Sequence, residues 1–315
     1  MRGVRGFIRW GILLVAVWLV FSAALGIALM EGALHTPRKV LTAEDESRAQ
    51  AIAERDHASL TNVMVAAADG VMLRGWSLIP RNGNGDAVIL LHGQGDNRAG
   101  LLENADLLMR HGFAVLMPDS RAHGESGGEI LTYGVKEVGD IRRWYGWLEQ
   151  SEAPHCIYGL GNSMGAAILL EATASEPGFC AVVAESPFSS FRDAAYLRLG
   201  QRFDTGPWLG RTVLLPAVEA GLFYARWRYG VNLDQSSPLN AVASSHVPIL
   251  LIHGLADTNL PPSNSEKIKA ANPALALWEP AGAGHCGAIS VAPAEYEQQV
   301  VGWFESHARA GKIAA

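Results

Sequence analysis

Strand-like and helix-like patterns alternate along the central part of this chain. Apolar runs typical of strands cover residues 87–92, 113–118, 156–161 and 180–185, and helical patterns between them cover residues 98–111, 134–150 and 164–175. Two earlier runs, residues 60–67 and 71–79, are separated by Asp69-Gly70 and predict a hairpin. Strands that alternate with helices pair in parallel through right-handed crossovers, so the pattern predicts an α/β fold with a doubly wound, mostly parallel sheet.

The first 30 residues follow a different pattern, a single long apolar run at residues 10–30. It carries no charge over 21 residues, and it is preceded by three arginines, Arg2, Arg5 and Arg9. About 20 apolar helical residues cross the hydrocarbon core of a bilayer, so we predict a transmembrane helix. The arginines before the run and Glu31 after it place the N-terminus in the cytoplasm and the rest of the chain outside the cytosol.

A cleaved signal peptide is the alternative for this segment, because Ser22-Ala23-Ala24 resembles a small-residue cleavage site. The apolar run continues past that site and is longer than a usual signal core, which favours a retained anchor. Cleavage would give a secreted or periplasmic protein. In both cases the globular part leaves the cytosol.

Three further regions follow the anchor. Residues 31–59 read as a polar connector, and residues 60–315 as one globular domain. Within it, residues 187–240 break the alternation with many large apolar side chains, and we predict two or more helices that form a cap. Trp208 and Phe223 are its candidate pocket residues, which would favour esters of moderate to long chains. Packing against the main domain or the membrane surface is an equal alternative.

One short motif carries the candidate chemistry. Gly161-Asn-Ser163-Met-Gly165 follows a strand-like run and precedes a helical pattern, the arrangement that lifts a serine hydroxyl clear of a sheet. Ser163 is therefore the candidate nucleophile, and it needs a base and an orienting acid. Asp257 and His285 follow in the expected order, each just past a later strand-like run. The carboxyl ends of parallel strands share one edge of the sheet, so we expect the three residues to meet there.

Two more loops extend the pattern. Residues 90–97 (LLHGQGDN) follow the first strong strand, and residues 118–128 (PDSRAHGESGG) follow the second. With the three candidate catalytic residues, they make the chain resemble the α/β-hydrolase fold family over roughly residues 60 to 310. The likeness is greatest to its serine hydrolase branch, which includes membrane-anchored α/β-hydrolase-domain proteins and relatives of monoacylglycerol lipase and of the serine and prolyl aminopeptidases.

The resemblance implies roles for named residues. Ser163 would attack the substrate carbonyl, His285 would act as the base and Asp257 would orient it. The backbone N–H groups of Gln94 and Met164 would form the oxyanion hole.

Asp257 has a competing structural interpretation. It would also suit a cap for the helix predicted near Pro262. Rival acids are Asp140 and Asp234, which fit the expected strand end less well. Four further residues are expected to shape loops rather than touch substrate: His92, His123, Arg121 and Glu125.

Other chemistries lack a recognisable frame in this sequence. It contains no H-E-x-x-H or C-x-x-C pair for zinc, and Arg98 stands where a dinucleotide loop needs its third glycine, so we predict no cofactor and no metal. The formal net charge of −6, without a dense basic run in the globular part, argues against nucleic acid. The predicted partners are a small-molecule or lipid ester and, through the N-terminal helix, a membrane.

The three cysteines leave the redox state open. Cys156 and Cys180 begin strands that the family resemblance makes parallel neighbours, so a disulfide is permitted in an oxidising compartment. We expect two buried free thiols instead. Cys286, beside the candidate base, stays unpaired in either version.

Together these features predict a membrane-anchored serine hydrolase that cleaves carboxylic esters through an acyl-enzyme. An amidase or aminopeptidase on the same three residues is the nearest alternative. Acyl transfer to an acceptor other than water is a third reading, and a catalytically silent binding module that kept the fold is a fourth.

Overall fold

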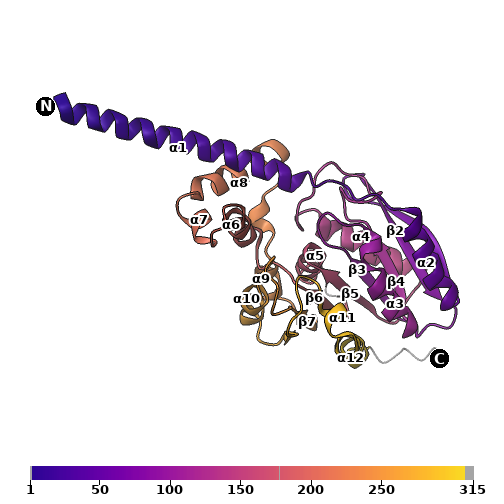
Figure 1. Cartoon of the computed structure of the whole chain (residues 1–315). Helices are drawn as coiled ribbons and strands as arrows, with labels where there is room; N and C mark the ends of the chain where they lie inside the picture. The colour runs from indigo at the N-terminus through magenta and orange to yellow at the C-terminus, as the bar shows by residue number, and fades with distance from the viewer. Residues whose placement is uncertain (1, 177, 309–315) are drawn as a thin grey trace. The chain divides into compact units, whose positions relative to one another are not determined.

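The computed structural model describes residues 2–176 and 178–308, and the chain separates into two compact units (Figure 1). One unit combines residues 1–35 with residues 190–235, and the other combines residues 36–189 with residues 236–315. We call them the N-terminal helix unit and the sheet unit. Most of the segment that breaks the α/β alternation, residues 190–235, is therefore grouped with the N-terminal helix.

An eight-stranded sheet forms the centre of the sheet unit, in the order β1-β2-β4-β3-β5-β6-β7-β8 (Figure 1). Its strands are β1 (Ala58–Ala66), β2 (Met72–Pro80), β3 (Ala87–Leu91), β4 (Ala114–Pro118), β5 (Ile157–Asn162), β6 (Val182–Glu185), β7 (Ile249–Ile252) and β8 (Ala276–Trp278). Strand β2 pairs antiparallel with both β1 and β4, and all other neighbours pair in parallel. The predicted mostly parallel, doubly wound sheet and its hairpin are confirmed.

Helices fill most of the connections between these strands, and others precede the first strand or follow the last. They are α2 (Ala43–Arg55), η1 (Arg98–Leu101), α3 (Leu102–Arg110), α4 (Glu137–Ser151), α5 (Met164–Ala172), α9 (Pro238–Val242), α10 (Ser263–Ala271), α11 (Ala288–Val291) and α12 (Pro293–Ser306). The predicted boundaries agree to within about three residues. The largest shifts are at the start of α4 and the end of α5.

Both faces of the sheet are covered, as continuous apolar strands require. Val88 and Leu90 of β3 belong to one core cluster with side chains of α2, α3 and α12. The alternate residues Ile89 and Leu91 are equally buried and point to the opposite face. The ring of Phe304 on α12 stacks on Tyr158 of β5 at 4.5 Å, which fixes the terminal helix against the sheet.

A disulfide joins Cys156 and Cys180, so the expectation of two free thiols is wrong. The cysteines lie just before β5 and β6, which pair from Gly159 with Val182 onward. This register holds the two Cα atoms 5.7 Å apart, a normal separation for a disulfide. Cys286 is unpaired.

The N-terminal helix unit contains α1 (Arg2–Leu34), α6 (Phe191–Arg202), α7 (Trp208–Arg211), α8 (Leu215–Tyr229) and η2 (Leu233–Gln235). Residues 6–34 of α1 are long and apolar enough to cross a membrane, with a mean hydropathy of 2.7. The C-terminal half of α1 packs along α8 (Figure 1). Within residues 187–240 the structure has several helices; the cap predicted for this segment stays a prediction.

Candidate active site

Ser163 occupies a sharp turn between β5 and α5. Its backbone has φ 55° and ψ −114°, a conformation that is strained for a residue with a side chain. The flanking glycines are required by space. A Cβ on Gly161 would lie 2.6 Å from the backbone of Gly165, and a Cβ on Gly165 would overlap the carbonyl oxygen of Leu91. The G-x-S-x-G pattern is therefore what allows the turn to sit directly on β3.

The structure brings the three predicted residues into one hydrogen-bonded chain. His285 Nε2 lies 2.8 Å from Ser163 Oγ, and His285 Nδ1 lies 2.7 Å from Asp257 Oδ2. The loops after β5, β7 and β8 supply one residue each, as expected for the carboxyl edge of a parallel sheet. Asp257 is buried, whereas the His285 side chain keeps 22% of its surface exposed.

Asp257 is held as a carboxylate by several donors. Its Oδ1 accepts the backbone N–H groups of Asn259 and Leu260, both at 2.9 Å. Burial opposes ionisation, but the contacts from His253, His285 and Leu260 outweigh it and keep the pKa of Asp257 well below its ordinary value. Asp257 therefore fixes the turn that follows it through Oδ1 and orients His285 through Oδ2.

His253 was not identified from the sequence. It directly follows β7, with Nε2 3.4 Å from Asp257 Oδ2 and 2.7 Å from the carbonyl oxygen of Leu260. Its Nδ1 lies 2.7 Å from Ser265 Oγ, and the side chain is fully buried. A histidine at a strand end, four residues before the candidate acid, was the available signal. It therefore lies beside Oδ2, the same carboxylate oxygen that His285 contacts.

The loop after β3 lies beside the serine. A Cβ on Gly93 would be only 3.4 Å from the Cβ of Ser163. The next N–H groups belong to Gln94 and Gly95, and the Gly95 N–H is taken by His123 Nε2 at 3.1 Å. On the other side, Met164 is the first residue of α5, and the first N–H groups of a helix have no acceptor within it. The two predicted oxyanion donors thus lie on the segments that border Ser163.

His92 and His123 have the loop-shaping positions that the sequence suggested. His92 Nε2 accepts the N–H of Ser120 at 3.0 Å, which ties the loop after β3 to the loop after β4. Burial, reinforced by neighbouring His92, lowers the pKa of His123 to about 4, and burial also lowers the pKa of His92. Both rings are neutral at pH 7 and can accept these backbone hydrogen bonds.

The first residues of the sheet unit also support the loop after β3. The Gln94 side chain donates from Nε2 to Thr36 Oγ1 at 2.9 Å, and Lys39 Nζ lies 2.7 Å from Asp96 Oδ1. Asn97 Nδ2 donates to the carbonyl oxygen of Lys39 at 3.2 Å. We call residues 36–39 the strap.

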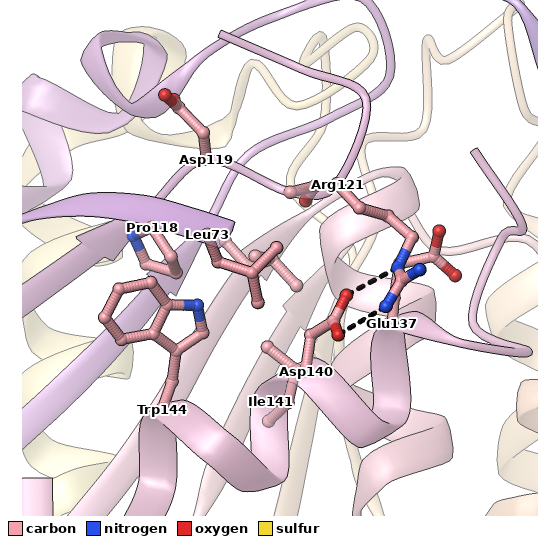
Figure 2. A pocket seen from close by; sticks show the side chains of 10 residues that line it. Leu73, Pro118, Asp119, Arg121, Glu137, Asp140, Ile141 and Trp144 are labelled. Atoms are coloured by element: carbon pink, nitrogen blue, oxygen red, sulfur yellow. Dashed lines mark hydrogen bonds and ion pairs between the residues drawn. The ribbon is translucent and has the colours of Figure 1, made fainter. Parts of the chain in front are cut away.

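Arg121 and Asp140 form a buried ion pair away from the serine. Figure 2 shows the two hydrogen bonds between them, at 2.6 and 2.7 Å, beside a small cavity of about 10 Å³. Burial raises the pKa of Asp140 to about 6 against the opposing effect of Arg121. The cavity is lined by β2, β3, α4 and the loop after β4, and Ser163, Asp257 and His285 are not among its lining residues. Asp140 therefore organises this loop and is not the partner of His285.

The remaining predicted residues lie elsewhere. Glu125 pairs with buried Arg98, which also lies 3.2 Å from Asp119. The rival acid Asp234 pairs with Arg192 in the N-terminal helix unit. Trp208 and Phe223 belong to that unit too, and they are 56% and 69% exposed; their role as pocket residues stays a prediction.

Glu185 is a second residue that the sequence analysis did not identify. It ends β6, its backbone carbonyl accepts the N–H of Ser163 at 2.8 Å, and its Oε1 accepts the N–H of Ala288 at 2.9 Å. Burial raises its pKa to about 7 against the stabilising effect of that N–H. A glutamate that closes an apolar strand was the signal. It connects the serine turn to the loop that carries His285.

Comparison with known proteins agrees with this architecture. The sequence model of the alpha/beta hydrolase family matches residues 88–299, which is more than half of the chain, and the chain belongs to that family. The YqkD protein of Bacillus subtilis (strain 168) is 28% identical over 211 residues, covering 66% of this chain and 67% of YqkD. The Rv2307c protein of Mycobacterium tuberculosis (strain H37Rv) is 30% identical over 213 residues, covering 67% and 66%.

Solved structures show the same fold. The esterase Pf2001 of Pyrococcus furiosus superposes with a TM-score of 0.67 at 26% identity, over 88% of this chain and 99% of that one. The acylaminoacyl peptidase of Pyrococcus horikoshii superposes with a TM-score of 0.59 at 17% identity, over 79% of this chain and 42% of that one. Hydrolase activity is thus supported at the level of the family, which hosts more than one substrate class.

Proposed function

We propose that this protein is a serine hydrolase that cleaves carboxylic esters through an acyl-enzyme. The observation that carries the proposal is the hydrogen-bonded chain from Ser163 Oγ through His285 to the Asp257 carboxylate. A hydroxyl needs such a base, and the base needs a fixed tautomer, before the oxygen becomes an effective nucleophile. Likeness to the Pyrococcus furiosus esterase favours esters over amides.

The reaction proceeds in two halves. Ser163 Oγ bonds to the acyl carbon while its proton passes to His285 Nε2, and the carbonyl oxygen becomes an oxyanion. The N–H groups of Gln94 and Met164 stabilise that charge, each by about 3 kcal/mol. His285 then gives its proton to the departing alcohol. Water repeats the sequence on the acyl-enzyme and releases the acid.

Throughout both halves Asp257 keeps its negative charge and stabilises the imidazolium. His253 and the two amides on Oδ1 hold that carboxylate in place, so it stays oriented toward His285 Nδ1. Glu185 restrains the loop that carries His285 through the N–H of Ala288.

We also propose that α1 is a retained anchor, with the N-terminus in the cytoplasm and the sheet unit outside the cytosol. The charge asymmetry around residues 10–30 supports this orientation. The Cys156–Cys180 disulfide suits an oxidising compartment. An intact mass of the protein purified from membranes tests retention: a mass that lacks residues 1–24 would mean a cleaved signal peptide.

A fluorescent fluorophosphonate tests the nucleophile. It should label the parent and a Ser151→Ala control, whose serine is exposed on α4, but not Ser163→Ala. Labelling of Ser163→Ala would mean that another serine reacts. A folded parent that takes no label would favour a binding module.

Matched p-nitrophenyl esters and p-nitroanilides then test the bond type. Ester cleavage well above anilide cleavage is expected. Comparable rates would move the assignment to an amidase.

A further inference from the structure

The N-terminal helix unit exposes an aromatic face beside its apolar helix. Phe223 and Trp227 lie one helical turn apart on α8, and their side chains are 69% and 72% exposed. Trp208, Val213 and Leu215 of the same unit are also exposed. Large apolar side chains that gather on one surface mark a contact with a partner or a membrane.

Small residues bring α8 close to α1. On α1 they are Ser22 and Gly26, and on α8 they are Ala217 and Gly221, each pair four residues apart. A Cβ on Gly221 would lie 2.9 Å from the carbonyl oxygen of Gly26, and one on Gly26 would overlap the backbone of Ala217. Small residues at this spacing are typical of helices that associate inside bilayers.

The depth of this contact follows from helix geometry. The uncharged run at residues 10–30 rises about 31 Å as a helix, close to the roughly 30 Å hydrocarbon core. A Cβ on Gly221 would lie 2.9 Å from Gly26 and 3.4 Å from Met30, both in the last two turns of that run. Residues in those turns that face away from α8, such as Leu29, are exposed. The part of α8 from Gly221 onward therefore lies at the depth of the last two turns of the apolar run.

Polar groups mark the edge of this layer. The hydroxyls of Tyr224 and Tyr229 both donate to Glu31 Oε1, one residue beyond the apolar run. Phe223 and Trp227 lie within three residues of Tyr224 on α8, which is within about 5 Å along the helix axis, so they are close to the level of this cluster. Tryptophan and tyrosine concentrate at this boundary between hydrocarbon and headgroups.

We propose that α8 lies in the outer interfacial layer of a phospholipid bilayer, packed along α1, with Phe223 and Trp227 inserted among the lipids. Arg226 and Arg228, both exposed in the last turn of α8, face the lipid phosphates. The inference rests on the proposed anchor, and it gives the aromatic side chains lipid contacts rather than the substrate pocket predicted from the sequence.

Site-specific fluorescence in vesicles tests this arrangement. The full chain, in a Cys286→Ala background, carries one nitrobenzoxadiazole label on Phe223→Cys or Trp227→Cys. Met64→Cys is the control, since Met64 is an exposed apolar residue (59%) on β1 of the sheet unit. Val17→Cys in α1 reports on the anchor. The vesicles are phosphatidylcholine with some phosphatidylglycerol, and they contain phosphatidylcholine with a nitroxide either near the glycerol or near the end of the acyl chain.

The shallow nitroxide should quench the labels at 223 and 227 more strongly than the deep one. The deep nitroxide should dominate at 17, and neither should quench the label at 64. If lipid nitroxides spare 223 and 227 while iodide in the buffer quenches them, and 17 is still quenched by lipid, the proposal is wrong and the anchor stands. A third outcome is that both quenchers spare the labels at 223 and 227 until the protein is diluted in lipid. This would mean that a second copy of the chain covers this face, and it would also overturn the proposal. An intact mass that lacks the N-terminus would locate the failure in the anchor instead.

Discussion

Opening the Cys156–Cys180 disulfide should destabilise the sheet unit without touching the serine turn. The bond closes a loop with a sequence separation of 24, between the starts of β5 and β6. In the chain-entropy treatment, a loop of this length constrains the unfolded state by about 3.5 kcal/mol at 25 °C. The double variant Cys156→Ala/Cys180→Ala removes that constraint, and Cys286→Ala is the matched control that removes the remaining thiol.

Urea unfolding at 25 °C in detergent, monitored by tryptophan fluorescence, measures the loss of stability. With a slope of about 3 kcal/mol per molar urea for a unit of this size, the midpoint of the double variant should fall by about 1.2 M. Reductant should shift the parent to nearly the same midpoint, because it removes the same cross-link. The small remaining difference comes from the two sulfur atoms that the double variant lacks. Reductant should leave the double variant and its urea midpoint unchanged.

Thiol counting in denaturant separates the two ways in which this reasoning can fail. One reactive thiol before reduction and three after it are expected, since Cys286 is the free cysteine. Three thiols before reduction would mean that the bond is absent from the purified protein. A closed bond whose reduction leaves the urea midpoint unchanged would refute the entropic account, and would mean that the unfolded chain keeps this loop compact without the bond.

Three further predictions concern the site. Asp257→Asn should lower kcat on an activated ester by about 10⁴-fold, because the amide favours the wrong tautomer of the base. The stability of His123→Asn should be less sensitive to acid than that of the parent. The pKa of His123 is about 4 in the folded state against 6.5 in the unfolded state, so the neutral ring contributes about 3 kcal/mol to the free energy of unfolding above pH 6.5, and this contribution is lost as the pH falls to 4. Urea midpoints measured across that pH range test this. Gly165→Ala should destabilise the fold by about 3 kcal/mol, because the added methyl overlaps the Leu91 carbonyl, whereas Gly146→Ala, which meets nothing within 4 Å on α4, should not.

Each of these has a clear contrary result. Full activity of Asp257→Asn would remove that carboxylate from the mechanism. If the stabilities of the parent and of His123→Asn fall in parallel with pH, the pKa of His123 in the folded state is close to its ordinary value. A stable Gly165→Ala would show that the serine turn can move away from β3.

Much of the fold was predictable because its signals are local. Strand runs bounded by turns, and the strained turn at Ser163 with its two glycines, are properties of short segments that tertiary packing did not override. Asp257 and His285 were found for a related reason, since the order of the strands brings their carboxyl ends to one edge.

What the sequence did not reveal depends on contacts between distant segments. The bond between Cys156 and Cys180 was not expected, because its formation depends on the register of β5 against β6. His253 and Glu185 read as ordinary residues at strand ends until the fold sets one against Asp257 and the other against the loop of His285. No local sequence pattern predicts which hydrogen-bond donors will contact a buried carboxylate.

The strap at residues 36–39 has a practical consequence for work on a shortened form. A chain shortened to begin at α2 keeps every strand of the sheet and the helices that cover both of its faces, so the sheet unit should fold. It nevertheless lacks the hydroxyl that holds the Gln94 side chain, the ammonium that pairs with Asp96 and the carbonyl that receives Asn97. Such a truncation would report a lower turnover than the native enzyme, and a chain starting at or before Thr36 is the appropriate form for measuring rates.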